Sequence, residues 1–427
     1  METLSFDDAQ ILGLESDAIK GHTGKLLVLA PSGQGEPLSA PSLRGRVAER
    51  IAGLPRLRQR VEVPKRGLPV WVDEPDVDLD WHVAEEPADP VDDDAFRRIA
   101  GEILAERLDH SRPLWRIDLV RLESGRTGMV GRIHHAMADG VSAIHTAGAL
   151  LFDPISAAPS DAQHESSKAH APGTPSEQKE RSRSLFRLPG ALRRELRPGR
   201  DSVLDRHIGS EREVAWTAFP LERLKAVGKG AGDHITVNDV VLAVVAGGLR
   251  RWLEAVGGRA EDLRAQVPVC LHLRDGDDSV GNRDSFLNVD LPISVADPIQ
   301  RLRRINAETE ERKLDHDADA LYSFFHALGR FKPLYKGVTR IVSGPREFAL
   351  SVSNVPGPRE RPTILGHEVH EFVSFAEPAD RHALRVAVIS LGGDLAFGLC
   401  SDPGAIEKLD ALAEALEESV AELEAAV

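Results

Sequence analysis

Two adjacent histidines, followed by three residues, an aspartate and a glycine, form the most chemically specific stretch of the sequence. His134 and His135 come directly after a short, apolar run at 128–133, which is typical of a strand. Asp139 stands where a helix cap belongs, and the apolar residues after it recur at helical spacing. Because neighbouring side chains on an extended backbone point to opposite faces, the two histidines are predicted to have different roles.

Histidine is suited to take a proton from a hydroxyl or a thiol, because its side chain titrates near neutral pH. Asp139 can brace the turn, and Gly140 leaves room beside His135 for a substrate. A core histidine beside an ordinary helix cap is the alternative. The full pattern, HHxxxDG, is more specific than a histidine pair. It resembles the motif of the CoA-dependent acyltransferase superfamily, which includes chloramphenicol acetyltransferase-like enzymes and peptide-synthetase condensation domains.

Length, charge and composition restrict the class of protein. A chain of 427 residues is longer than a single hydrophobic core usually organises, so we expect two domains. The net charge of −15 argues against general nucleic-acid binding, which needs a basic face. Cys270 and Cys400 lie far apart and are expected to be reduced in a cytosol. The first residues lack a secretory pattern, and the apolar run at 240–249 is shorter than the roughly 20 residues that span a bilayer. We therefore expect a cytoplasmic protein, with only peripheral membrane contact.

Further stretches make the family assignment more precise. They are 54–60 (LPRLRQR), 78–83 (DLDWHV), 111–115 (SRPLW), 236–243 (TVNDVVLA) and 353–358 (SNVPGP). Read with the histidine motif, they resemble the bacterial wax ester synthase/diacylglycerol acyltransferase (WS/DGAT) family and follow the order of its motifs. The resemblance covers the chain except for about 153–211. One departure is Ser390-Leu391, where relatives are expected to have a serine–tyrosine pair.

The resemblance implies an α/β (α+β) protein with two chloramphenicol acetyltransferase-like domains packed around a central tunnel. The domains are expected at 1–152 and 212–427, joined by a flexible, partly basic linker at 153–211. His135, at the middle of the tunnel, would be the general base. Acyl-CoA would be the co-substrate, with no other cofactor. The acceptor would be the hydroxyl of diacylglycerol, a long-chain alcohol, or both.

The resemblance also implies supporting residues, whose roles stay open from sequence. Asn238 and Asp239 either cap a buried helix, in a Thr-x-x-Asp arrangement that starts at Thr236, or support the catalytic loop or the thioester oxygen. Asn238 and Ser353 are candidate donors to the oxyanion of the tetrahedral intermediate.

Within the histidine motif itself, the remaining side chains are expected to support the loop. Asp139 is expected to form a salt bridge with an arginine such as Arg274, and Gly140 provides space. His134 is expected to serve in packing or in selecting a tautomer.

The linker contains a basic island that contrasts with the acidic chain. Its cations are Lys179, Arg181, Arg183, Arg187, Arg193, Arg194, Arg197 and Arg200, interleaved with leucines. Such a pattern is typical of a segment that binds an anionic membrane or a lipid-droplet surface. A solvated linker is the alternative, since Pro189-Gly190 would break a helix.

Other motifs are absent or weak. No HExxH or paired-cysteine spacing indicates a metal, and no GxSxG elbow indicates a covalent acyl-enzyme. The glycine-rich stretch 228–232 is predicted to be a turn rather than a phosphate loop. Two rival functions stay open: a condensation-type acyltransferase using carrier-tethered thioesters, which the absence of a carrier module disfavours, and an inactive lipid-binding paralogue, which the intact motif disfavours. The sequence does not indicate an oligomeric state.

Overall fold

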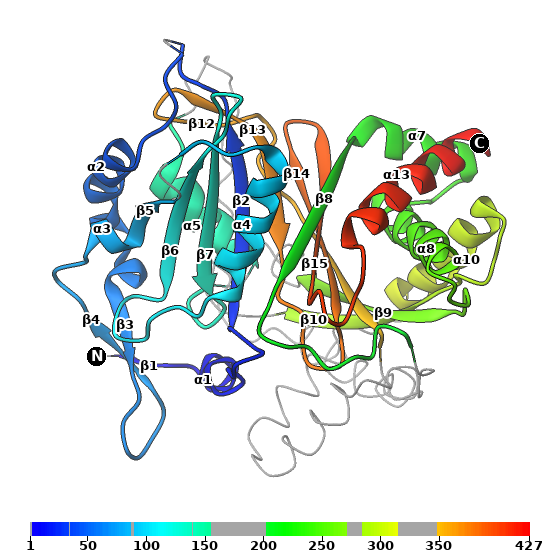
Figure 1. The fold of residues 1–427 in the computed structure, drawn as a ribbon. Coiled ribbons are helices and arrows are strands. Elements are labelled where there is room, and N and C mark those ends of the chain that lie inside the picture. Colours follow the sequence, from blue (N-terminus) through cyan, green and yellow to red (C-terminus); the bar gives the residue numbers. More distant parts are fainter. Residues whose placement is uncertain are drawn as a thin grey trace, which may run out of the picture.

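The computed structural model describes residues 2–33, 35–86, 89–138, 140–154, 202–270, 284–314 and 348–427. Two six-stranded sheets, each with its own helices, stand side by side (Figure 1). A smaller sheet of β1 (Glu2–Thr3), β4 (Val70–Asp73) and β3 (Gln59–Glu62) lies beside the first. The predicted α/β architecture with two packed units is thereby confirmed.

The first sheet contains the histidine strand in its interior. Its strands, in spatial order, are β12 (Thr363–Ile364), β13 (His367–Phe375), β2 (His22–Leu29), β7 (Thr127–His134), β6 (Trp115–Arg121) and β5 (Val83–Glu85). β2 and β7 pair antiparallel over their full length and place His22 opposite His134. β7 is therefore fixed by hydrogen bonds on both edges, which makes its end a rigid support for the loop that follows.

The second sheet is mixed. Its order is β10 (Asp284–Leu291), β9 (Leu263–Cys270), β11 (Leu350–Val355), β14 (Leu384–Leu391), β15 (Asp394–Ser401) and β8 (Glu213–Pro220). β11 runs parallel to both of its neighbours, whereas the other pairs are antiparallel. β14 and β15 form a hairpin across Gly392-Gly393, and both glycines have positive φ.

Within the described ranges, α-helices cover the outer face of the second sheet (Figure 1). They are α7 (Leu221–Ala231), α8 (Val237–Ala255), α10 (Pro298–Leu314) and α13 (Leu409–Ala425). α8 is buried without interruption from Asp239 to Leu249, as its apolar sequence predicts. The last helix begins at Leu409, and Ile406 packs in the core from the preceding turn.

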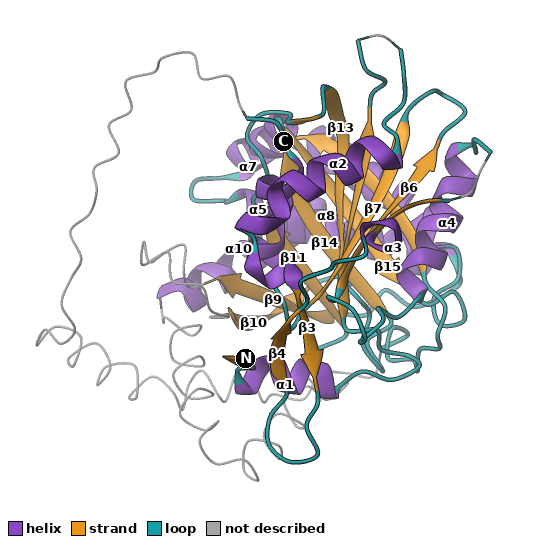
Figure 2. Ribbon diagram, turned by 90° about the vertical axis from the view of Figure 1, so that its left-hand side faces the viewer, coloured by secondary structure: helices purple, strands orange, loops and turns teal. Residues whose placement is uncertain are grey.

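The helices of the first unit approach the sheet closely. α2 (Ala40–Arg50) and α5 (Gly140–Leu151) cross one face of this sheet (Figure 2). α4 (Asp93–Ala105) packs on the opposite face, where glycines in the strands leave space for its side chains. A Cβ at Gly24 would lie 2.5 Å from the Leu104 side chain, and one at Gly128 would lie 2.3 Å from Phe96. The remaining helical segments are α1 (Phe6–Gly13), α3 (Leu79–His82), and the 3-10 turns Ile51–Gly53 and Pro55–Arg58.

The two sheets are not made from two separate halves of the chain. β12 and β13 come from the C-terminal half, yet β13 pairs antiparallel with β2 of the first sheet. In Figure 1 the orange β13 accordingly lies next to the blue β2. Core residues such as Ile389 and Leu391 also belong to the hydrophobic cluster of the first sheet. The C-terminal half therefore contributes to both units. The predicted ranges 1–152 and 212–427 assign β12 and β13 to the second domain only.

The predicted linker is described only at its two ends. Asp153 accepts hydrogen bonds from Thr363 Oγ1 at 2.7 Å and Gly366 N at 2.9 Å, and pairs with Arg46 at 2.7 Å. Residues 202–211 contain no helix or strand, as expected, but Leu204 is fully buried in the core of the second unit. These last residues are therefore packed rather than free. The basic island lies outside the described residues.

Within the described ranges, no helix is both long enough and apolar enough to cross a bilayer.

Two buried histidines are expected to make the free energy of unfolding depend on pH. His82 is fully buried, with its Nδ1 2.7 Å from the Trp115 carbonyl oxygen, and its ring stacks on Trp115. Burial lowers the pKa of His82 to about 4, and it lowers the pKa of His22 well below the ordinary value. Between pH 6.5 and 4 the unfolded chain binds protons that the folded chain does not, so stability falls with falling pH.

We expect His82 alone to lower the free energy of unfolding by on the order of 1–2 kcal/mol between pH 6.5 and 5. Urea titrations at both pH values measure it. The variant His82→Gln cannot titrate, and its smaller dependence on pH isolates this contribution from those of other groups. Equal pH dependence in both proteins would contradict the prediction.

Candidate active site

The histidine motif forms the connection from β7 to α5. β7 ends at His134 and α5 begins at Gly140, as the sequence predicted. The intervening turn is closed by the His134 carbonyl oxygen, which accepts from Met137 N at 2.8 Å and from Ala138 N at 3.4 Å. Asp139 lies outside the described residues, so its expected brace and the salt bridge with Arg274, which is also outside them, stay predictions.

His134 is fully buried, and both of its ring nitrogens face protein groups. Ala136 N donates to His134 Nδ1 at 3.1 Å. On the other side of the ring, Nε2 lies 2.8 Å from Glu15 Oε1. A ring enclosed in this way offers no nitrogen to a substrate hydroxyl.

His135 has a different environment. It is half-buried, and its backbone N–H donates to the carbonyl oxygen of Gly21 at 2.9 Å. The two adjacent histidines thus differ in exposure, as strand alternation predicts.

Gly21 has a packing role that the sequence did not reveal. Its φ of 76° lies in the left-handed region that glycine tolerates best, and a Cβ there would lie only 2.3 Å from His134 Nε2. Only glycine lets the backbone before β2 approach the histidine ring so closely.

Glu15 is the buried carboxylate of the site. Its side chain is only 5% exposed and also contacts Arg107 and His110, whose Nε2 lies 3.0 Å from Oε1. Burial raises the pKa of Glu15, but hydrogen bonds from His110, His134 and Arg107 outweigh burial and hold the pKa far below its ordinary value. Glu15 is therefore ionised at any pH at which the protein would work.

Glu377 holds the same segment from the other side. It follows β13, and its carboxylate accepts from Lys20 N at 2.5 Å and Gly21 N at 2.7 Å. The buried guanidinium of Arg212 pairs with this carboxylate at 3.0 Å. The segment 15–21 is thus fixed to the histidine motif at its ends and to the C-terminal half through Glu377.

The SNVPGP stretch lies beside the histidine motif. A Cβ at Gly140 would lie 3.7 Å from Val355 Cγ2, so the start of α5 faces the end of β11. Gly357 N donates to Ser390 Oγ at 2.9 Å, so Ser390 fixes the turn after β11. The departure at Leu391 affects a side chain that packs in the first core and not this hydrogen bond.

Comparison with known proteins identifies the family. Residues 4–198 match the profile described as the wax ester synthase/diacylglycerol acyltransferase catalytic domain, and residues 280–424 match the WS/DGAT C-terminal domain. The chain belongs to the WS/DGAT family. It is 31% identical to Rv3087 of Mycobacterium tuberculosis (strain H37Rv) over 94% of this chain and 92% of the relative. It is 28% identical to the probable diacylglycerol O-acyltransferase tgs2 of the same strain, over 100% of both chains.

Solved structures with the same fold include a WS/DGAT protein and a condensation domain. The wax ester synthase/diacylglycerol acyltransferase from Marinobacter aquaeolei VT8 has a TM-score of 0.71 at 23% identity, covering 99% of both chains. The first condensation domain of the calcium-dependent antibiotic synthetase has a TM-score of 0.61 at 17% identity, covering 100% of this chain and 96% of that one. These likenesses concern the fold.

Asp239, in the stretch 236–243, is held by residues of its own unit. Its Oδ2 accepts from Thr236 N, Thr236 Oγ1 and Asn306 Nδ2 at 2.8, 2.7 and 3.1 Å, and Oδ1 accepts from Thr309 Oγ1 at 2.6 Å. Burial raises the pKa of Asp239, but these bonds lower it below the ordinary value. The capping box is formed as predicted. Both carboxylate oxygens of Asp239 accept hydrogen bonds from the N-cap residue of α8 or from residues of α10. Asn238 is half-buried in the first turn of α8.

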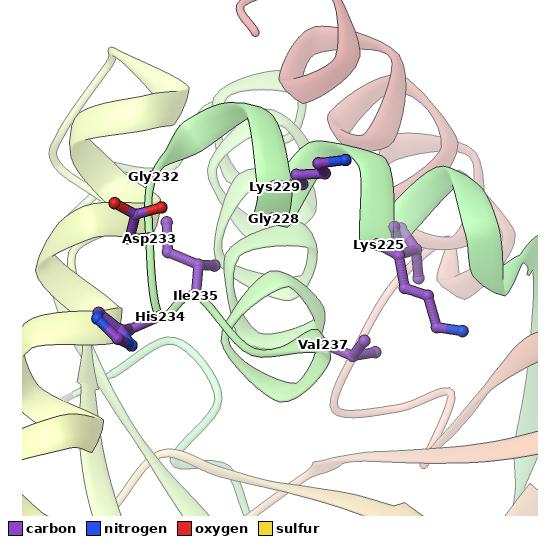
Figure 3. Close-up of a pocket in the computed structure, with 9 residues that line it drawn as sticks. Lys225, Gly228, Lys229, Gly232, Asp233, His234, Ile235 and Val237 are labelled. Carbon is purple, nitrogen blue, oxygen red and sulfur yellow. The ribbon is translucent and has the colours of Figure 1, made fainter.

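The glycine-rich stretch 228–232 was predicted to be a turn, which is only partly right. Residues 228–231 form the end of α7, and only Gly232 leaves the helix. A cavity of about 260 Å³ lies between this end and the start of α8. Figure 3 shows Lys225 and Lys229 extending away from Asp233 rather than toward a common point. The cations therefore do not form a phosphate cradle.

Metal and thiol chemistry have little support in the described ranges. They contain no group of three or more His, Cys, Asp or Glu residues placed to hold a metal ion. Cys400 is a free, buried cysteine, and burial raises its pKa to about 12. Its thiol is therefore protonated and a poor nucleophile.

The structural role of Asp239 can be tested through its partner. Thr309→Val keeps the shape of the buried Thr309 side chain and removes one hydrogen bond to Asp239. We expect the free energy of unfolding to fall by about 1–3 kcal/mol, with acyl transfer per folded molecule unchanged. Denaturant titration and turnover measure both effects. A large loss of turnover at unchanged stability would instead place Asp239 in the catalytic machinery.

Proposed function

We propose that this protein is an acyl-CoA-dependent O-acyltransferase. It transfers a fatty acyl group to the hydroxyl of diacylglycerol, a long-chain alcohol, or both, and so produces triacylglycerol or wax ester. Membership of the WS/DGAT family supports the reaction class, and the names of tgs2 and the Marinobacter protein support the acceptors. The observation that carries the mechanism is the enclosure of His134 beside a half-buried His135.

In the proposed mechanism His135 is the general base. Its neutral ring takes the proton of the acceptor hydroxyl while the oxygen attacks the thioester carbonyl of acyl-CoA. The tetrahedral intermediate then breaks the carbon–sulfur bond, and the CoA thiolate recovers the proton from His135. Ester and free CoA are the products. Acyl-CoA is consumed as a co-substrate, and no acyl-enzyme is formed.

Strand geometry favours Ser353 over Asn238 as the donor to the oxyanion. Residues two apart on a strand point to the same face, so Ser353 shares its face of β11 with Val355. Val355 packs beside Gly140 of the histidine motif, and Ser353 is half-buried. Such a donor is typically worth roughly 3–4 kcal/mol of transition-state stabilisation. Asn238 remains the second candidate, at the start of α8.

Product analysis tests the function. The protein is incubated with palmitoyl-CoA and equal amounts of dioleoylglycerol and hexadecanol, and the esters are separated while released CoA is titrated. We expect triacylglycerol, wax ester or both, each with one CoA released. Turnover only with a carrier-tethered acyl group would favour the condensation-type alternative. Acyl-CoA binding without any ester would favour the inactive lipid-binding alternative.

The histidine pair tests the mechanism. His135→Ala should lose about a hundred- to ten-thousand-fold in rate and keep its fold, since a positioned base contributes about that much. His134→Ala should have a larger fall in melting temperature and a smaller fall in turnover, because it removes a packed side chain and one of the contacts of the buried Glu15 carboxylate. Asp139→Asn should lie between them. A folded but inactive His134→Ala would reverse the assignment, and three active variants would exclude this site.

A further inference from the structure

We propose that Glu15 is a positioning residue of this active site: it orients the ring of His134, and His134 in turn holds the loop from which His135 acts. This inference rests on the proposed function of His135 as the base. It assigns a role to a residue far from the histidine motif in sequence, on the loop before β2.

The first step is the choice of tautomer. An imidazole nitrogen that accepts a hydrogen bond carries no proton, and Nδ1 of His134 accepts from Ala136 N. The proton of the neutral ring is therefore on Nε2, which lies 2.8 Å from Glu15 Oε1. An ionised carboxylate at this place favours the protonated nitrogen, so Glu15 selects the tautomer that leaves Nδ1 free to accept.

The second step is the loop itself. All four backbone N–H groups from His135 to Ala138 have acceptors: Gly21 O for His135, His134 Nδ1 for Ala136, and His134 O for Met137 and Ala138. Three of these four bonds end on His134. A rotation of the His134 ring would release Ala136 and with it the residue next to His135.

The third step is the anchoring of Glu15. Arg107 and His110 contact its carboxylate from the exposed side, with side chains 44% and 37% exposed, and they separate it from solvent. Glu377 binds Lys20 N and Gly21 N at the other end of the same segment. Glu15 is thus held where it meets His134, and Gly21 is held where it meets His135.

Two substitutions with different severity test the proposal. Glu15→Gln keeps the shape and an oxygen acceptor but removes the charge, whereas Glu15→Leu removes the acceptor. We expect the kcat of acyl transfer to fall about tenfold for the first and about a hundredfold for the second, since small misplacements in an active site have costs of this order. The KM for palmitoyl-CoA should stay within about twofold, because Glu15 does not contact substrate.

Asp153→Asn is the matched control. Like Glu15, Asp153 is a carboxylate that pairs with an arginine and is mostly removed from solvent. It pairs with Arg46 and accepts a hydrogen bond from Thr363, and it lies outside the active site. It should lose melting temperature and keep its kcat. A Glu15→Gln protein with wild-type kcat, or with changes only in KM and melting temperature, would overturn the positioning role.

Histidine ¹⁵N NMR provides a test that does not require turnover. The His134 ring should show a protonated Nε2 in the wild type between pH 6 and 8, and these signals should change in Glu15→Gln. Unchanged signals would overturn the proposal even in an inactive protein. Failure of the proposed function would appear differently, as a wild type that makes no ester or as a fully active His135→Ala.

Discussion

The antiparallel pairing of β13 with β2 is the constraint on which the rest of the structure depends. It completes the first sheet with a strand from the C-terminal half. It also brings Glu377, directly after β13, to the loop before β2. The position of that loop decides where Glu15 and Gly21 meet the two histidines. The geometry of the motif is therefore determined by a contact between distant parts of the chain, and not by the motif alone.

The histidine motif shows how adjacent identical residues acquire different environments. Burial and two polar contacts make His134 part of the scaffold, whereas His135 keeps a less enclosed position after the strand has ended. The Ala136 backbone N–H donates to one nitrogen of the buried ring, and the Glu15 carboxylate lies 2.8 Å from the other. In the proposed mechanism, support and reactivity are separated by one residue.

Local patterns predicted well what depends on local physics. Alternation predicted the different exposure of His134 and His135, the Thr-x-x-Asp spacing predicted the capping box at Asp239, and apolar composition predicted the burial of α8. Glu15 could not be found in this way, because a lone acid after an exposed leucine is typical of a surface. Its contacts are with residues about a hundred positions away, which no local pattern reveals. The prediction of a turn at 228–232 was wrong for most of that stretch for the opposite reason. Local glycine content suggested a turn, but residues 228–231 continue the helix.

The crossing of β13 also has a consequence for synthesis on the ribosome. Thr23 bonds to the Phe375 carbonyl oxygen, a partner 352 residues later in the chain. The first sheet cannot close until that strand has been made, so the early strands wait with an unpaired β2 edge. Contacts of such large sequence separation slow folding, and open strand edges invite association between chains. A nascent chain of this architecture would therefore gain most from a chaperone that shields β2 until translation has passed Phe375.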